Sequence, residues 1–318
     1  MLASPQPMHI PDGFLSIVTS VICWLITVAI LSMAVSRTNK NLGERQVPLM
    51  GVMAAFIFAA QMINFPVAGG TSGHLLGGAL AAITLGPWAG MLVMTAVIAV
   101  QGLLFQDGGL LVMGANILNM GLLTAAVGYG LYRSAAGKNQ TTKLIVAGIA
   151  AWLSVMTGAL ATSLQLWLSS TARIDIVVPA MLAVHALIGL GEALITVAAL
   201  SFILRMRPDI LGEESASAQG SRGWVIAGIL ITLAVVLLSP LASADPDGLE
   251  RVAHDLGFIS TAQSAPYQVI PDYTIPFLGT TSLSTIVAGL IGVLVVLAVA
   301  FLTGRSLMQK KSSTDRRS

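Results

Sequence analysis

The chain has 318 residues, of which 55% are apolar and 9% charged, and its mean hydropathy is +0.86. Soluble domains carry about 25% charged residues, so this composition predicts a protein that crosses a lipid bilayer several times. The net charge of +2 excludes a basic nucleic-acid-binding face. The single cysteine, Cys23, excludes an internal disulfide or a thiolate metal cluster.

Nine segments are long and apolar enough for membrane helices, which need about 20 residues each. In chain order they are 14–36, 47–64, 71–85, 88–105, 110–132, 142–168, 177–206, 224–242 and 281–304. The third is short and rich in glycine. The sequence therefore predicts an all-α membrane protein with a seven-helix core over 8–207, a polar linker over 208–222, a two-helix hairpin module over 223–304, and a basic tail over 305–318.

The positions of Lys and Arg predict the orientation, because inner loops are enriched in both residues. With the N-terminus outside, 14 of the 16 basic residues fall on the cytoplasmic side, and only Arg173 and Arg251 fall outside. The same arrangement puts five acidic residues in the outer loop between the last two spans, where they form either a solvated loop or a cation-attracting surface. These are Asp245, Asp247, Glu250, Asp255 and Asp272.

The N-terminal stretch carries the first candidate ligands. We expect MLASPQP to be an upstream extension from a misassigned start, so that the chain begins at Met8. Met8 would then offer its α-amine, and His9 its amide and imidazole nitrogens, to one divalent ion. Three such nitrogens favour the planar geometry that suits Ni(II), Cu(II) and Co(II). Pro11-Asp12-Gly13 then predicts a turn back toward the bundle.

Histidines elsewhere supply further candidates. His74 lies in AGGTSGHLLGG, among glycines that let backbones approach closely, and is the expected fourth ligand. His185 and Glu192 share one helix face. Counting 1.5 Å per residue from residue 177 puts them about 12 and 22 Å deep, too deep to join His9 and His74. Three roles stay open for this pair: a structural polar pair, a metal or proton relay, and a coupling element.

Four polar residues in QDGGLLVMGANILN are candidates for orienting a histidine ligand through hydrogen bonds. They are Gln106, Asp107, Asn116 and Asn119. A helix-capping role for Asp107 is the alternative.

Four ordered blocks, MHIPDGFLS, GTSGHLLGGAL, QDGGLLVMGANILNM and HALIGLGEALIT, resemble the substrate-binding membrane component of cobalt and nickel energy-coupling factor transporters. The resemblance covers Met8 to about Arg207. It implies a seven-helix core and an ion site made by the Met8 amine, the His9 amide and imidazole, and His74. DPDGLERVAHDLGF followed by PDYTIPFLG resembles the small auxiliary subunit of these transporters, fused here to the core and thought to assist metal loading.

The resemblance implies an ATP-driven importer that captures Co(II) or Ni(II) as its cargo and holds no permanent cofactor. The sequence has no GxxxxGK[ST] loop, so we expect two ATP-binding cassette ATPase subunits and a transmembrane coupling subunit as partners, in the inner membrane of a bacterium or archaeon. The alternative is a stand-alone proton-coupled permease using His185 and Glu192. We do not expect an intramembrane metalloprotease, because HExxH and a cysteine cluster are absent from the sequence.

Overall fold

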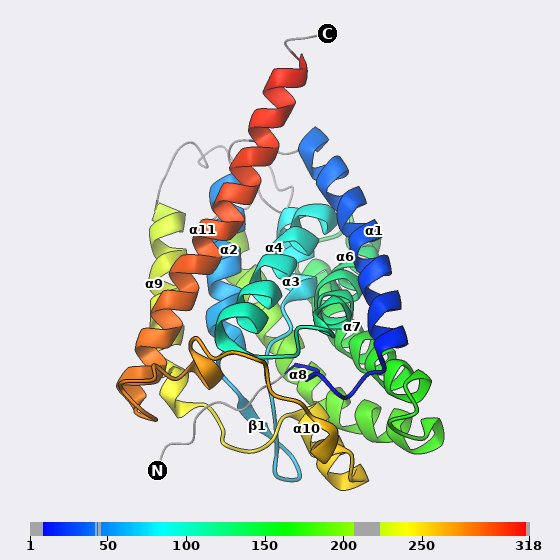
Figure 1. Cartoon of the computed structure of the whole chain (residues 1–318). Helices are drawn as coiled ribbons and strands as arrows, with labels where there is room; N and C mark the ends of the chain where they lie inside the picture. Colours follow the sequence, from blue (N-terminus) through cyan, green and yellow to red (C-terminus); the bar gives the residue numbers. More distant parts are fainter. Residues whose placement is uncertain (1–8, 42, 44–45, 207–222, 316–318) are drawn as a thin grey trace.

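A computed structural model describes residues 9–41, 43, 46–206 and 223–315 (Figure 1). Met8 and the linker over 208–222 lie outside these residues. The helices are α1 (Ile17–Asn41), α2 (Gln46–Gln61), α3 (Gly78–Leu85), α4 (Pro87–Val100), α5 (Met113–Asn116), α6 (Thr124–Tyr132), α7 (Gln140–Leu168), α8 (Ile174–Met206), α9 (Gly223–Leu238), α10 (Gly248–Leu256) and α11 (Ser282–Asp315). Two short strands, β1 (Phe65–Val67) and β2 (Thr71–Gly73), pair antiparallel with Phe65 opposite Gly73.

Six helical stretches are long and apolar enough to cross a membrane, which confirms a multi-spanning protein. They are Ile17–Asn39, Pro87–Phe105, Gln140–Leu168, Ile174–Met206, Gly223–Leu241 and Ser282–Gln309. The 16-residue α2 is a shorter apolar helix. Between α5 and α6, π-helical turns over Ile117–Leu123 make Met113–Tyr132 continuous. These six stretches do not confirm the predicted count of nine spans, and the outward N-terminus stays a prediction.

The prediction of a spanning helix over 71–85 is wrong. Only Gly78–Leu85 is helical, and eight residues rise about 12 Å against the ~30 Å of a hydrocarbon core. The preceding residues form β2 and an extended stretch that ends at Gly77, whose φ of 83° is left-handed. Glycine adopts that conformation without strain, so the chain enters the bundle as extended backbone before α3 begins.

The two long helices of the second module do not form a separate hairpin. Helix α2 packs against both α9 and α11, and Figure 1 shows the three helices on the same side of the molecule. Two glycines permit the close approach: a Cβ on Gly51 would lie 3.3 Å from the Leu297 carbonyl oxygen in α11, and one on Gly228 in α9 would lie 2.6 Å from the Val52 side chain. The second module is therefore packed onto the core through α2.

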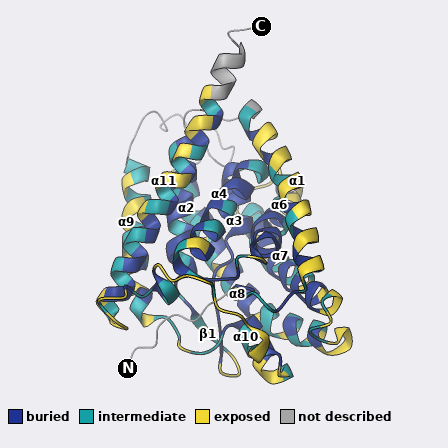
Figure 2. Ribbon diagram, in the orientation of Figure 1, coloured by how far each residue is buried: buried dark blue, intermediate teal, exposed yellow. Residues whose placement is uncertain are grey.

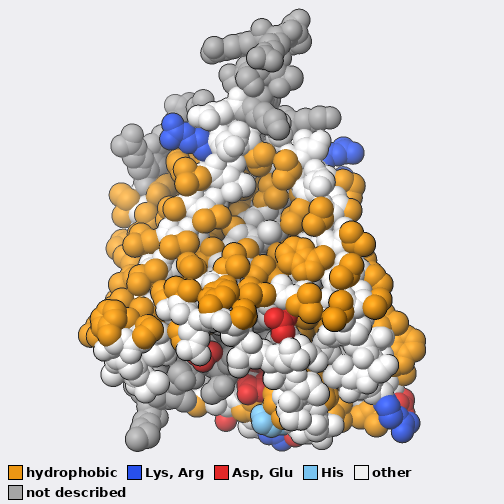
Figure 3. Space-filling model, viewed as in Figure 1, with side chains coloured by type: hydrophobic (Ala, Val, Ile, Leu, Met, Phe, Trp, Pro, Cys, Tyr) orange, Lys and Arg blue, Asp and Glu red, His pale blue; other side chains and the backbone are white. Residues whose placement is uncertain are grey.

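The surface matches a membrane environment. Figure 2 shows α3 and α4 buried in the middle of the molecule, with exposed residues along the outer face of α1. Leu25 on α1 is 67% exposed and Leu302 on α11 is 59% exposed. In Figure 3, hydrophobic side chains cover the middle of the molecule, and acidic and histidine side chains gather at the lower end, where α10 and the β1–β2 turn lie in Figure 1. An apolar girdle of this kind suits lipid contact.

Candidate metal centre

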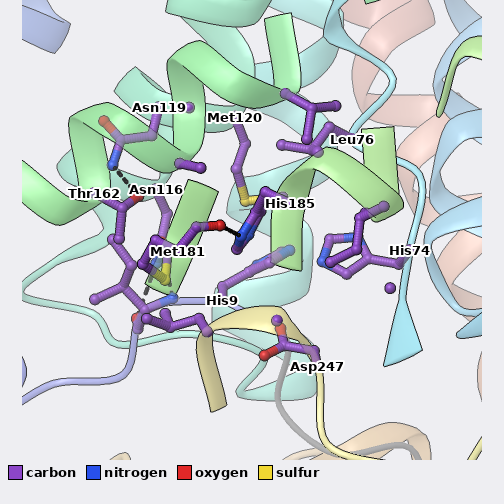
Figure 4. A pocket seen from close by; sticks show the side chains of 18 residues that line it. His9, His74, Leu76, Asn116, Asn119, Met120, Thr162, Met181, His185 and Asp247 are labelled. Atoms are coloured by element: carbon purple, nitrogen blue, oxygen red, sulfur yellow. Dashed lines mark hydrogen bonds between the residues drawn. The ribbon is translucent and has the colours of Figure 1, made fainter. Parts of the chain in front are cut away.

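A buried cavity of about 60 Å³ lies at the lower end of the bundle, where the N-terminal segment, β2, α8 and α10 meet. Figure 4 shows the side chains that line it. The polar ones come from six separate parts of the chain: His9, His74, Asn116, Asn119, Thr162, His185 and Asp247. The cavity therefore collects three of the four histidines of the sequence.

The N-terminal segment is clamped to the stretch before α5. Asn116 accepts a hydrogen bond from the Ile10 amide and donates one to the Ile10 carbonyl, both at 3.0 Å. The Asp12 carboxylate accepts the amides of Leu110, Leu111 and Val112 at 3.0–3.1 Å. Sequence reasoning assigned Asp12 only to a turn. Its carboxylate instead binds the backbone that presents Asn116, and so fixes the position of His9.

His9 is 3% exposed and reaches the cavity through a tight approach. Its Nδ1 lies 3.0 Å from the Asp107 carbonyl oxygen, while its Nε2 is buried without a hydrogen-bond partner among the described residues. Gly108 makes room for the ring: its φ is +99°, and a Cβ there would lie 2.8 Å from the His9 Cβ. A buried ring nitrogen without a partner costs free energy, so His9 is arranged to meet a ligand.

His74 is 8% exposed and lies beside His9, with ring centroids 5.9 Å apart. Metal–nitrogen bonds measure about 2 Å, so two imidazoles bound to one ion have centroids roughly 4.5 Å apart when adjacent and roughly 6.4 Å apart when opposite. Glu192 supports the segment that follows His74, because its carboxylate accepts the amides of Leu76 at 2.6 Å and Gly77 at 2.9 Å. Glu192 therefore fixes the backbone beside a candidate ligand.

The structure corrects the depth expected for His185. It lines the same cavity as His9 and His74, so the three histidines lie at one level of the bundle. His185 contacts the Met181 carbonyl, whereas Glu192 contacts the backbone before α3. The two residues share a helix face but have separate partners, so the first of the three roles left open, a polar pair, is not formed between them.

All three cavity histidines have Nδ1 within hydrogen-bond distance of a backbone carbonyl. The distances are 3.0 Å from His9 to Asp107, 3.0 Å from His74 to Leu75, and 2.8 Å from His185 to Met181. A carbonyl oxygen only accepts, so a neutral ring in this arrangement carries its proton on Nδ1 and its lone pair on Nε2. Such contacts orient histidine ligands in metal sites.

The other predicted orienting residues separate into two groups. Asn119 lines the cavity and hydrogen-bonds to Thr162 and Gln165 of α7. Asp107 holds His9 through its carbonyl, and its carboxylate accepts a 2.7 Å hydrogen bond from the Tyr273 hydroxyl. Gln106 does not orient a histidine. Its side chain donates a hydrogen bond to the Leu103 carbonyl and accepts one from the Val269 amide in the second module. Its backbone is left-handed, with a φ of 55°.

The second module reaches the cavity through the loop before α10. Asp247 is 5% exposed, lines the cavity, and caps α10 by accepting the Glu250 amide. Burial raises the pKa of the Asp247 carboxyl to about 8. Sequence reasoning placed Asp247 in an outer acidic loop, and no local signal placed it beside the histidines.

Among the described residues, no three His, Cys, Asp or Glu side chains converge closely enough to hold a metal ion by themselves. The cavity brings His9, His74 and His185 together as candidates, and a complete coordination sphere needs further ligands or a small approach of the rings. Met8, the predicted amine ligand, is the residue before His9 and lies outside the described residues.

Comparison with known proteins divides the chain in two. Residues 9–210 match the family CbiM, described as the cobalt uptake substrate-specific transmembrane region. Residues 222–309 match the PDGLE domain. The first match ends at residue 210 and the second begins at residue 222.

Similar proteins share both parts. The chain is 35% identical to a putative fused nickel transport protein NikMN of Archaeoglobus fulgidus over 92% of this chain and 97% of that protein. It is 29% identical to the fused nickel transport protein NikMN of Rhodobacter capsulatus over 92% of this chain and 95% of that protein. A crystal structure of a transition metal transporter is 33% identical, with a TM-score of 0.58 over 67% of this chain and 100% of that chain.

Proposed function

Because the chain belongs to the CbiM family of cobalt and nickel transport components, with a PDGLE domain fused behind it, we propose that it is the substrate-capture component of an ATP-driven energy-coupling factor importer. Its cargo is Co(II) or Ni(II), taken up at the outer side of the inner membrane. The observation that carries this proposal is the convergence of His9, His74 and His185 on one buried cavity.

The proposed ligands are the α-amine of Met8, the amide and imidazole of His9, and the imidazole of His74. The two rings lie beside each other at one cavity, with centroids 5.9 Å apart, and a small approach would bring them to adjacent positions on one ion. A chelate ring that includes the His9 amide nitrogen closes through Nδ1, the ring nitrogen next to Cγ. In the structure this atom contacts the Asp107 carbonyl, so an ion bound this way replaces that hydrogen bond.

The ion-loaded component would act with a transmembrane coupling subunit and two ATP-binding cassette ATPases. We expect cells that express this chain with those partners to accumulate radiolabelled Ni(II) or Co(II), and cells that express the chain alone to accumulate none. The matched control carries partners with an inactive ATPase. Accumulation that persists with the inactive ATPase and collapses with the proton gradient would contradict the proposal and favour a proton-coupled permease.

The alternative of a stand-alone permease rests on a relay between His185 and Glu192. In the structure the Glu192 carboxylate is occupied by two backbone amides, and His185 contacts Met181. This arrangement favours an anchoring role for Glu192, and the ATP-driven importer is therefore the proposal that the geometry supports better.

The amine of Met8 gives a second test. A chain that begins at Met8 offers a free α-amine, whereas a chain that begins at Met1 has an amide nitrogen at the same position. Amide nitrogens bind metal only after deprotonation, so we expect the Met8 form to bind one Ni(II) per chain far more tightly than the Met1 form. Intact mass and metal analysis of both purified forms check this, and equal binding would remove the amine from the site.

A further inference from the structure

We propose that the ion site of this chain is shared between its two domains, with Asp247 of the PDGLE domain as the acidic group that receives the incoming divalent cation in front of His9, His74 and His185. This inference rests on the proposed function and adds a residue that the core does not supply. Figure 4 shows Asp247 at the same cavity as the three histidines.

The loop that carries Asp247 is docked on the core beside the site. The Ser72 amide donates to the Pro246 carbonyl at 2.8 Å, and the Ser72 hydroxyl donates to the Asp245 carbonyl at 2.7 Å. Ser72 belongs to β2, two residues before His74. The residues 245–247 therefore continue the edge of β2 and close the cavity on the side of His74.

Gly248 brings this wall into direct contact with α8. A Cβ on Gly248 would lie 2.9 Å from the His185 Cε1 and 2.8 Å from the Ile188 Cδ1. The backbone of the PDGLE domain therefore touches a cavity histidine with no room for a side chain. Leu249 follows at 7% exposure and also lines the cavity, so the segment 247–249 is part of the cavity wall.

The charges around Asp247 point to a cation as its partner. Its Oδ1 accepts the Glu250 amide, and no Lys or Arg is present among the described residues that line the cavity. A buried carboxylate without an opposite charge is costly. His9 and Asp247 line the same cavity. A divalent cation that enters it would give the Asp247 carboxylate an opposite charge before it reaches the imidazoles, since carboxylate oxygen and imidazole nitrogen both bind divalent transition metals.

Asparagine at position 247 gives a clean test, because Asn caps a helix as well as Asp does and removes only the charge. The control is Asp245→Asn in the same loop, whose side chain contacts Ser243 and does not line the cavity. Binding of Ni(II) and Co(II) to the full-length chain in detergent is measured by calorimetry and stopped-flow. Melting curves fix a temperature at which all variants are folded.

We expect Asp247→Asn to lower the affinity or the association rate for the ion at least about tenfold, the size of effect seen for groups that support metal ligands. The affinity and association rate of Asp245→Asn should be close to those of the unchanged chain. If Asp247→Asn binds with unchanged affinity and rate while His74→Ala loses binding, the shared site is wrong and the proposed function stands. If His74→Ala also binds normally, the proposed ligand set is wrong, whereas the importer itself is tested separately by the uptake experiment with the inactive ATPase. An equal loss in both Asn variants indicates a general surface charge effect and overturns the role of Asp247.

Discussion

Replacement of His74 by Ala is expected to abolish the capture of Ni(II) and Co(II) while leaving the helical bundle folded. His74 is 8% exposed, and its ring centroid lies 5.9 Å from that of His9. Loss of a group that only supports a metal ligand costs about 10- to 100-fold in affinity, and loss of a ligand itself should cost more. Calorimetric titration of the purified chain with each ion measures the effect.

The matched control for this variant is His254→Ala. The His254 side chain is 54% exposed on α10 and lies 3.8 Å from Glu250 on the same helix. The substitution therefore removes one imidazole without changing the cavity. We expect the control to bind one ion per chain with unchanged affinity. Stoichiometric binding by the His74 variant would contradict the assignment of His74 as a ligand, and an equal loss in both variants would show that the effect is not specific to the cavity.

The parts of the fold that sequence predicted best are those governed by local chemistry. Long apolar segments such as 142–168 and 177–206 correspond to α7 and α8, because about 20 mostly apolar residues have few alternatives to a membrane helix. Segment 71–85 was not predicted correctly because Gly77 and the paired strands β1 and β2 override its apolar composition. The hydropathy of such a segment does not distinguish a short helix from a full span.

The site residues that sequence identified are likewise those marked by a local motif, and the ones it missed depend on long-range contacts. His9 and His74 were identified from residue type and motif, and the structure places them side by side. His185 was assigned to the wrong depth because a count along α8 assumes that the other ligands stay at the outer end. The place of Asp247 depends on hydrogen bonds from Ser72 to a loop more than 170 positions away, and no local pattern encodes a contact of that range.

Replacement of Glu192 by Leu is expected to lower both the stability of the protein and its ion binding. Glu192 is fully buried on α8. Its carboxylate accepts the Leu76 and Gly77 amides, and Gln61 from α2 donates to the Leu76 carbonyl at 2.7 Å. Glu192→Leu leaves two buried amides without an acceptor, at about 1–3 kcal/mol each. We therefore expect a clear fall in melting temperature and weaker ion binding, because the backbone after His74 loses its anchor. Thermal unfolding in detergent measures the first effect and ion titration the second.

Two comparisons make this prediction specific. Thr196→Val changes a fully buried residue one turn further along α8, whose hydroxyl has no hydrogen-bond partner within the described residues, so we expect almost no loss of stability. Glu192→Gln keeps one acceptor oxygen, so its melting temperature should lie between those of Glu192→Leu and the unchanged chain. A Glu192→Gln variant that melts normally and binds the ion, but loses uptake driven by a proton gradient, would contradict the anchoring role and return Glu192 to the relay of a stand-alone permease.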